Sequence, residues 1–256
     1  MVSLFDMLVL FVGAVCVGFV SAISGIGGGS LIVPFLVLVL NYDIRVAIAV
    51  SLLCMVISSS SAVSVYLKRN LVSLETALSL EPAAVLGAIV GANLTLTIPV
   101  KVVKCAFGVL LFWISIIMFK RALKSELHQH STMNIPHRKI IAILMSFLAG
   151  LLSGMFGIGG GIVKVPIMTF ILRLPVKIAV ATSSFMIGLT ATSGGIVYLI
   201  KGFVNPVLLA VLALGLIPGA TLGAKLMRKL KPRIIRLIFS LILLYASLRL
   251  IHSIVV

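Results

Sequence analysis

Apolar residues fill most of the chain and are collected in long runs that polar segments separate. Two of these runs, 140–152 and 237–248, contain no charged residue at all. Such runs are typical of helices that cross a membrane, which need about 20 apolar residues. In the first half the pattern predicts a long helix, a short apolar piece and three further helices, at 4–23, 31–40, 46–67, 71–94 and 100–119.

The same order of segments returns in the second half, because the chain contains an internal repeat. Positions between 21 and 94 match positions 132 residues further on, without a gap. The G-I-G-G-G sequence at 25–29 recurs at 157–161, and Val33-Pro34 recurs as Val165-Pro166. The predicted counterparts lie at 140–155, 163–172, 178–200, 203–226 and 234–252. We therefore divide the chain into a first transmembrane repeat (1–121), a polar linker (122–137) and a second transmembrane repeat (138–256).

The basic residues indicate how the two repeats are oriented. If all five elements of each repeat cross the membrane and the N-terminus is outside, then Lys68 and Arg69, the segment 120–139 and the segment 225–236 are all cytoplasmic. If the short piece does not cross, the two richest basic clusters fall on opposite sides, against the positive-inside rule. We therefore predict inverted repeats. A re-entrant short piece is the alternative.

Composition places the chain in the membrane. Hydrophobic residues make up 61% of it and charged residues only 10%, whereas soluble domains have about 45–50% and about 25%. The sequence thus predicts an all-α polytopic membrane protein and excludes a water-soluble enzyme. The net charge of +16 is explained by loop cations that face an anionic cytoplasmic leaflet, so we expect the lipid bilayer and not nucleic acid as the partner.

The three cysteines lie in apolar runs without a C-x-x-C pair, and the H-x-H spacing at 128–130 lies in the polar linker without further ligand types. Neither pattern is typical of a metal site. We expect no metal and no cofactor.

The two glycine clusters are the leading candidates for a binding site. A run of glycines disfavours helix, and unwound backbone at membrane depth must be buried in protein or face a cavity. Each cluster therefore predicts a helix break followed by a half-helix whose first N–H groups can bind an anion. The alternative is that the glycines only allow close helix packing. The candidate substrate-binding glycines are Gly25, Gly27, Gly28 and Gly29 in the first half and Gly157, Gly159, Gly160 and Gly161 in the second.

Four other residues could complete such a site. Ser51 and Ser183 match across the repeat, and their hydroxyls can donate to an anion, although such hydroxyls also bond back to their own helix. Lys164 stands at the position equivalent to Ile32 of the first half. It could bind the anion, or extend its amine to the membrane surface. Glu81 replaces Ala213 of the second half and could couple transport to protons, or have a purely structural partner.

The doubled motif resembles a known family. In each half, G-I-G-G-G is followed by V-P and then by a basic residue, Arg45 or Lys177, before A-x-A-x-S. This combination over about 250 residues is similar to the sulfite exporter TauE/SafE family. The resemblance implies a secondary transporter, usually described with seven or eight spans, for small sulfur-containing anions such as sulfite, thiosulfate or organosulfonates.

An ion gradient would drive such a transporter, so the resemblance implies a coupling ion, H⁺ or Na⁺, beside the small anionic substrate. We expect a multi-pass protein of a prokaryotic cell membrane. The sequence is compatible with a homo-oligomer but does not determine the oligomeric state. The alternatives are an anion channel, a transporter of a different small organic anion, or an accessory membrane protein without transport. An enzyme is disfavoured because the apolar segments hold no catalytic constellation.

Overall fold

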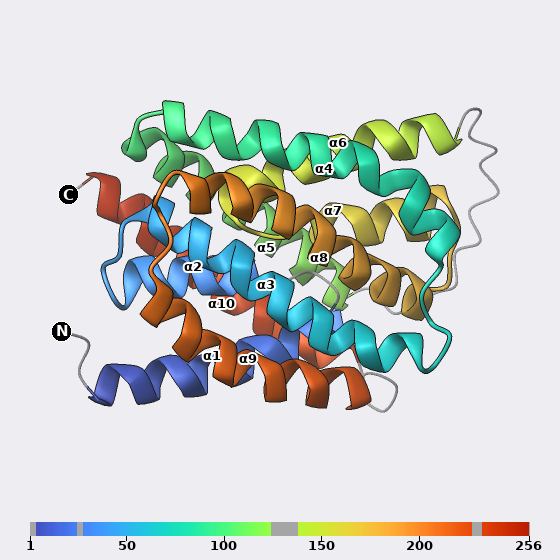
Figure 1. Ribbon diagram of the computed structural model, residues 1–256, viewed down its shortest axis with the longest axis horizontal. Coiled ribbons are helices and arrows are strands. Elements are labelled where there is room, and N and C mark those ends of the chain that lie inside the picture. The colour runs from blue at the N-terminus through green and yellow to red at the C-terminus, as the bar shows by residue number, and fades with distance from the viewer. Residues whose placement is uncertain (1–3, 25–27, 124–137, 227–231, 256) are drawn as a thin grey trace.

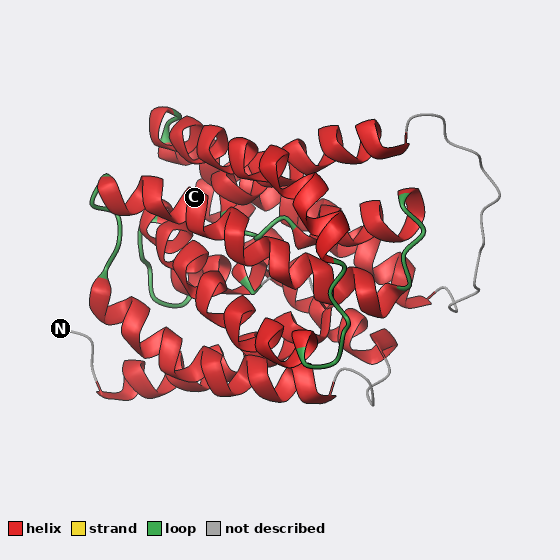
Figure 2. Ribbon diagram, turned by 45° about the vertical axis from the view of Figure 1, so that its right-hand side comes forward, coloured by secondary structure: helices red, strands yellow, loops and turns green. Residues whose placement is uncertain are grey.

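The computed structural model describes residues 4–24, 28–123, 138–226 and 232–255, and all regular structure in these ranges is helical (Figure 2). The first half contains α1 (Leu4–Ser24), α2 (Gly29–Leu38), α3 (Ile44–Leu67), α4 (Leu74–Thr97) and α5 (Val100–Leu123). The second half contains α6 (Arg138–Phe156), α7 (Gly161–Pro166) with the π-helical turn η1 (Ile167–Ile171), α8 (Val176–Ile200), α9 (Pro206–Leu226) and α10 (Pro232–Val255).

Most of these helices have the length and composition of membrane spans. In the described ranges six helices are long and apolar enough to cross a bilayer: α3, α4, α5, α6, α8 and α9. Shorter apolar helices lie within α1, α2, α10 and the α7–η1 segment. The prediction of an all-α polytopic membrane protein is confirmed. The predicted linker, 122–137, lies outside the described residues except at its edge, where α5 continues to Leu123.

The helices of the two halves interleave. α1 packs along α9, α6 along α4, α5 along α10, and α3 along α8, so each of these pairs joins one half to the other. Small residues let the backbones touch. A Cβ on Gly87 of α4 would lie 2.1 Å from the Phe147 oxygen of α6, and a Cβ on Gly219 of α9 would lie 2.2 Å from the Val15 oxygen of α1. The two sequence units therefore share one core and do not pack as separate bodies.

Several contacts occur twice, at positions 132 residues apart. The Tyr66 hydroxyl of α3 donates to the Ala22 oxygen of α1, and the Tyr198 hydroxyl of α8 donates to the Gly154 oxygen of α6 at 3.0 Å. The turns after α3 and α8 also agree, because Asn70 and Gly202 both have positive φ. The two halves thus have the same tyrosine hydrogen bond and the same type of turn at equivalent positions of the repeat.

The two halves also run in opposite directions through the molecule. α1 begins at the end of the bundle where both chain termini lie, whereas α6 begins at the opposite end, where α5 finishes (Figure 1). Lys68 and Arg69, together with Lys225, belong to helix ends on the α5–α6 side. This arrangement is compatible with the predicted inverted repeats, which stay a prediction. The assignment of that side to the cytoplasm stays a prediction.

Candidate functional site

Both glycine clusters interrupt a helix. α1 ends at Ser24 and α2 begins at Gly29, whereas α6 ends at Phe156 and α7 begins at Gly161. In the second cluster Gly157, Gly159 and Gly160 have φ values of +66°, +77° and +67°, a backbone region that side chains disfavour. Gly25 and Gly27 lie outside the described residues.

The short helices start in the same way after the two interruptions. The amides of Leu31 and Ile32 donate to the Gly28 oxygen, both at 3.0 Å. The amides of Val163 and Lys164 donate to the Gly160 oxygen at 3.1 and 2.9 Å. Each short helix therefore begins directly at its glycine cluster, as the sequence pattern predicted.

The two interruptions touch each other. A Cβ placed on Gly29 would lie only 1.7 Å from the carbonyl oxygen of Gly157, so the start of α2 rests directly on the backbone of the second cluster. The Ser51 hydroxyl of α3 donates to that same Gly157 oxygen at 2.8 Å. Both contacts cross from the first half to the second. They bring the two glycine clusters into one site near the middle of the bundle.

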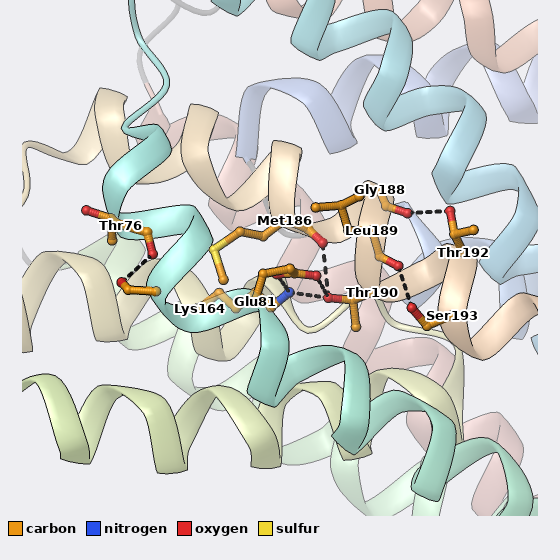
Figure 3. Close-up of polar contacts among 10 residues, drawn as sticks. Thr76, Glu81, Lys164, Met186, Gly188, Leu189, Thr190, Thr192 and Ser193 are labelled. Atoms are coloured by element: carbon orange, nitrogen blue, oxygen red, sulfur yellow. Dashed lines mark hydrogen bonds and ion pairs between the residues drawn. The ribbon is translucent and has the colours of Figure 1, made fainter.

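A buried ion pair lies one turn beyond the second cluster. The Lys164 Nζ is 3.1 Å from the Glu81 Oε2, and the two side chains are 0% and 6% exposed. Thr190 of α8 completes the group, because its hydroxyl oxygen is 2.5 Å from the Lys164 Nζ and 2.5 Å from the Glu81 Oε1 (Figure 3). Lys164 therefore points into the protein, and the alternative that it extends to the membrane surface is wrong for this structure.

Most of the other hydroxyls near the site bond to their own helix. Ser184 donates to the Val180 oxygen at 3.0 Å, and Thr192 and Ser193 bond back in the same manner (Figure 3). Ser183 is buried in α8. Thr190 does not stand out in the sequence, because α8 contains several other hydroxyl residues. Only the packing of α4 and α7 against α8 distinguishes it, because no sequence signal pairs Thr190 with Glu81.

A separate basic pocket of about 470 Å³ lies between the end of α2 and the helices α5 and α10. Lys104, Arg249 and His252 line it, together with Tyr245 and Asn41, and no acidic side chain of the described residues does so. Arg249 donates to the Tyr245 hydroxyl oxygen at 3.1 Å. The pocket suits an anion electrostatically. It belongs to the end of the bundle where both termini lie.

Comparison with known proteins identifies the family. Residues 10–250 match the family described as Sulfite exporter TauE/SafE. The chain belongs to this family. It is 29% identical to the protein named "Probable membrane transporter protein YunE" of Bacillus subtilis, over 96% of this chain and 97% of that protein. It is also 29% identical to "Probable membrane transporter protein MJ0441" of Methanocaldococcus jannaschii, over 92% of this chain and 91% of that protein.

A plant relative carries the family name itself. "Sulfite exporter TauE/SafE family protein 6" of Arabidopsis thaliana is 38% identical over 37% of this chain and 22% of that protein. No solved structure matches the chain. Membership in the TauE/SafE family, together with the six span-length helices of the described ranges, makes the chain a multi-pass membrane protein of a transporter family.

Proposed function

We propose that the protein is a secondary transporter of small sulfur-containing anions, such as sulfite, thiosulfate or organosulfonates, which it moves by alternating access. One observation carries the proposal: the two glycine clusters meet, Gly29 against the Gly157 oxygen, and a buried lysine follows one turn later. Interrupted helices that meet inside a bundle are the usual construction of transporter binding sites. The family description, Sulfite exporter TauE/SafE, supports the choice of this substrate class.

The site has the chemistry that a small anion needs. Glycines let a ligand approach backbone N–H groups closely, and Lys164 supplies a full positive charge within the first turn of α7. Ser183 and Ser51 contribute hydroxyls, although Ser51 reaches an anion only when it releases the Gly157 oxygen. A sulfonate or sulfite group presents several oxygens and can accept from several of these donors at once.

The packing supports a movement of rigid units. Backbone-to-backbone contacts through Gly87 and Gly219 hold α4 on α6 and α1 on α9, and close packing transmits movement without deformation. The glycine clusters follow the ends of α1 and α6, one helix of each pair, and in the second cluster Gly157, Gly159 and Gly160 have positive φ and no regular helix. We therefore place the moving joint at the glycine clusters and the rigid bodies in the helix pairs.

Flux through purified protein in liposomes tests the proposal. The panel contains sulfite, thiosulfate, methanesulfonate, sulfoacetate and taurine, with chloride for comparison. We expect saturable uptake of at least one sulfur-containing anion, and loss of this uptake in Gly160→Leu, where a Cβ already lies 2.8 Å from the Ala149 oxygen. Gly202→Leu is the control for backbone strain, because Gly202 has a similar positive φ, +75°, but no atom lies within 4 Å of the new Cβ. Flux that rises linearly with concentration indicates a channel, and no flux of any panel anion refutes the proposal.

A further inference from the structure

The Lys164–Glu81 pair is present in one half only, so the fold itself does not require it. At the positions 132 residues earlier or later stand Ile32 and Ala213, and both helices form there without a charge. Replacing a buried ion pair by apolar residues is often neutral or stabilising. The pair is therefore weak evidence for stability and stronger evidence for a function.

Its position links the pair to the binding site that we have proposed. Lys164 lies on α7, directly after the second glycine cluster, whereas Glu81 comes from α4 of the other half. The Glu81 carboxylate is the anion that pairs with the Lys164 ammonium in this structure. It holds the place that an anionic substrate at Lys164 would take.

From this geometry we propose that Glu81 is an internal competitor for Lys164, and that a substrate anion displaces it as Glu81 takes up a proton. The protein would then carry one proton together with each singly charged anion. This inference rests on the proposed function and adds the coupling ion to it.

The charge balance requires the proton. One ammonium beside two negative groups leaves an uncompensated charge in a low-dielectric site, which is strongly unfavourable. When the anion binds Lys164 and the lysine N–H leaves the Glu81 Oε2, that oxygen takes up a proton from the aqueous side from which the anion entered. The empty site holds one positive and one negative charge, and the loaded site holds lysine, the anion and a neutral carboxylic acid. Both forms of the site are neutral. The change between outward-facing and inward-facing states therefore moves no net charge across the membrane in either form.

Thr190 acts as a positioning residue in this exchange, because its hydroxyl can change its acceptor. Its hydroxyl has a single proton but two acceptors in reach, the Glu81 Oε1 at 2.5 Å and the Met186 oxygen at 3.0 Å. It can donate to the carboxylate in the empty form and to its own helix after Glu81 has moved. The equivalent Ser58 donates only to the Met55 oxygen, at 3.3 Å, in the half that lacks the ion pair.

The other ionisable groups on the elements around the pair belong to helix ends or already have a partner. They are Glu75 at the start of α4, Arg138 and Lys139 at the start of α6, Arg173 after η1, Lys177 at the start of α8, and Tyr198, which donates to Gly154. Among these groups and the pair itself, Glu81 is the carboxylate next to Lys164. The proton count should therefore depend on Glu81 alone.

The full-length protein in liposomes with an entrapped pH dye tests the inference. Labelled methanesulfonate is the main probe, because it has no group that titrates near neutral pH, and sulfite is the second probe. We expect about one proton to enter with each methanesulfonate, and no net charge movement. In Glu81→Gln the anion still moves, but the proton count falls at least tenfold and the flux responds to membrane potential. Glu75→Gln, an exposed acid on the same helix, should keep the wild-type ratio.

The possible outcomes separate the two proposals. Flux of a probe without protons in the wild-type protein overturns the coupling and leaves the transport function standing. An unchanged proton ratio in Glu81→Gln also overturns it. If neither probe moves, the measurement is repeated with the other anions of the panel, and no flux of any of them in the wild-type protein overturns both. Thr190→Val should shift the pH profile of flux, and Thr190→Ser should restore it; a purely structural Thr190 would alter the amount of folded protein without moving the profile.

Discussion

The contact between the two glycine clusters allows a sharp test at Gly29. An alanine there would place its Cβ 1.7 Å from the Gly157 oxygen and 2.7 Å from the Ser51 hydroxyl oxygen. The first of these neighbours is backbone, which cannot rotate away. We predict that Gly29→Ala separates α2 from the second cluster, and that one added methyl group is enough to damage both stability and transport.

The magnitude follows from two costs. Overpacking a close contact costs about 1–3 kcal/mol. Separation also breaks the 2.8 Å hydrogen bond from Ser51 to the Gly157 oxygen, and an unpaired buried carbonyl costs about 1–3 kcal/mol. Together these give about 2–6 kcal/mol. For a chain of this size the melting temperature should fall by at least about 4 °C.

The assay is thermal unfolding of the purified protein in detergent, paired with anion flux in liposomes. Gly13→Ala is the matched control, because its Cβ would lie 3.2 Å from a ring carbon of Phe35, a side chain that can shift slightly. The control should unfold within about 1–2 °C of the wild type, since this adjustment costs well under 1 kcal/mol. A wild-type melting temperature and flux in Gly29→Ala would refute the conclusion that the two clusters rest on each other.

Four further predictions use other parts of the structure. An impermeant thiol reagent should label a cysteine in the linker 122–137 only after the cells are opened, once the native cysteines are replaced; labelling in intact cells would reverse the topology. Lys164→Met should weaken anion binding at least tenfold, about 1.4 kcal/mol, whereas Lys164→Arg keeps part of it, and equal affinities in titrations would remove Lys164 from the site. Gly160→Leu should abolish flux although the protein still inserts, which fractionation of membranes checks. Tyr66→Phe and Tyr198→Phe should each lower the free energy of unfolding by about 1 kcal/mol, and a large difference between them in denaturant titrations would contradict their equivalence.

Local features of the sequence determined the class of the fold and the places where its helices stop. Run length and apolarity decide whether a segment crosses a bilayer, and glycine disfavours helix wherever it is placed. The interruptions after Ser24 and Phe156 could therefore be predicted from the residues alone. The doubled motif also indicated the family, because its residues are close together in the chain.

Only the tertiary structure decided which of the candidate residues act together. Lys164 and Glu81 are 83 residues apart, and Ser51 is 106 residues from Gly157. The sequence marked Lys164 and Glu81 separately as charges in apolar surroundings, but it contained no sign that they are partners. Hydrophobic periodicity specifies which face of a helix is buried and not which helix covers it. The interleaving of the two halves brings α4 to α7 and α3 to the second glycine cluster, and backbone contacts between distant helices fix that arrangement.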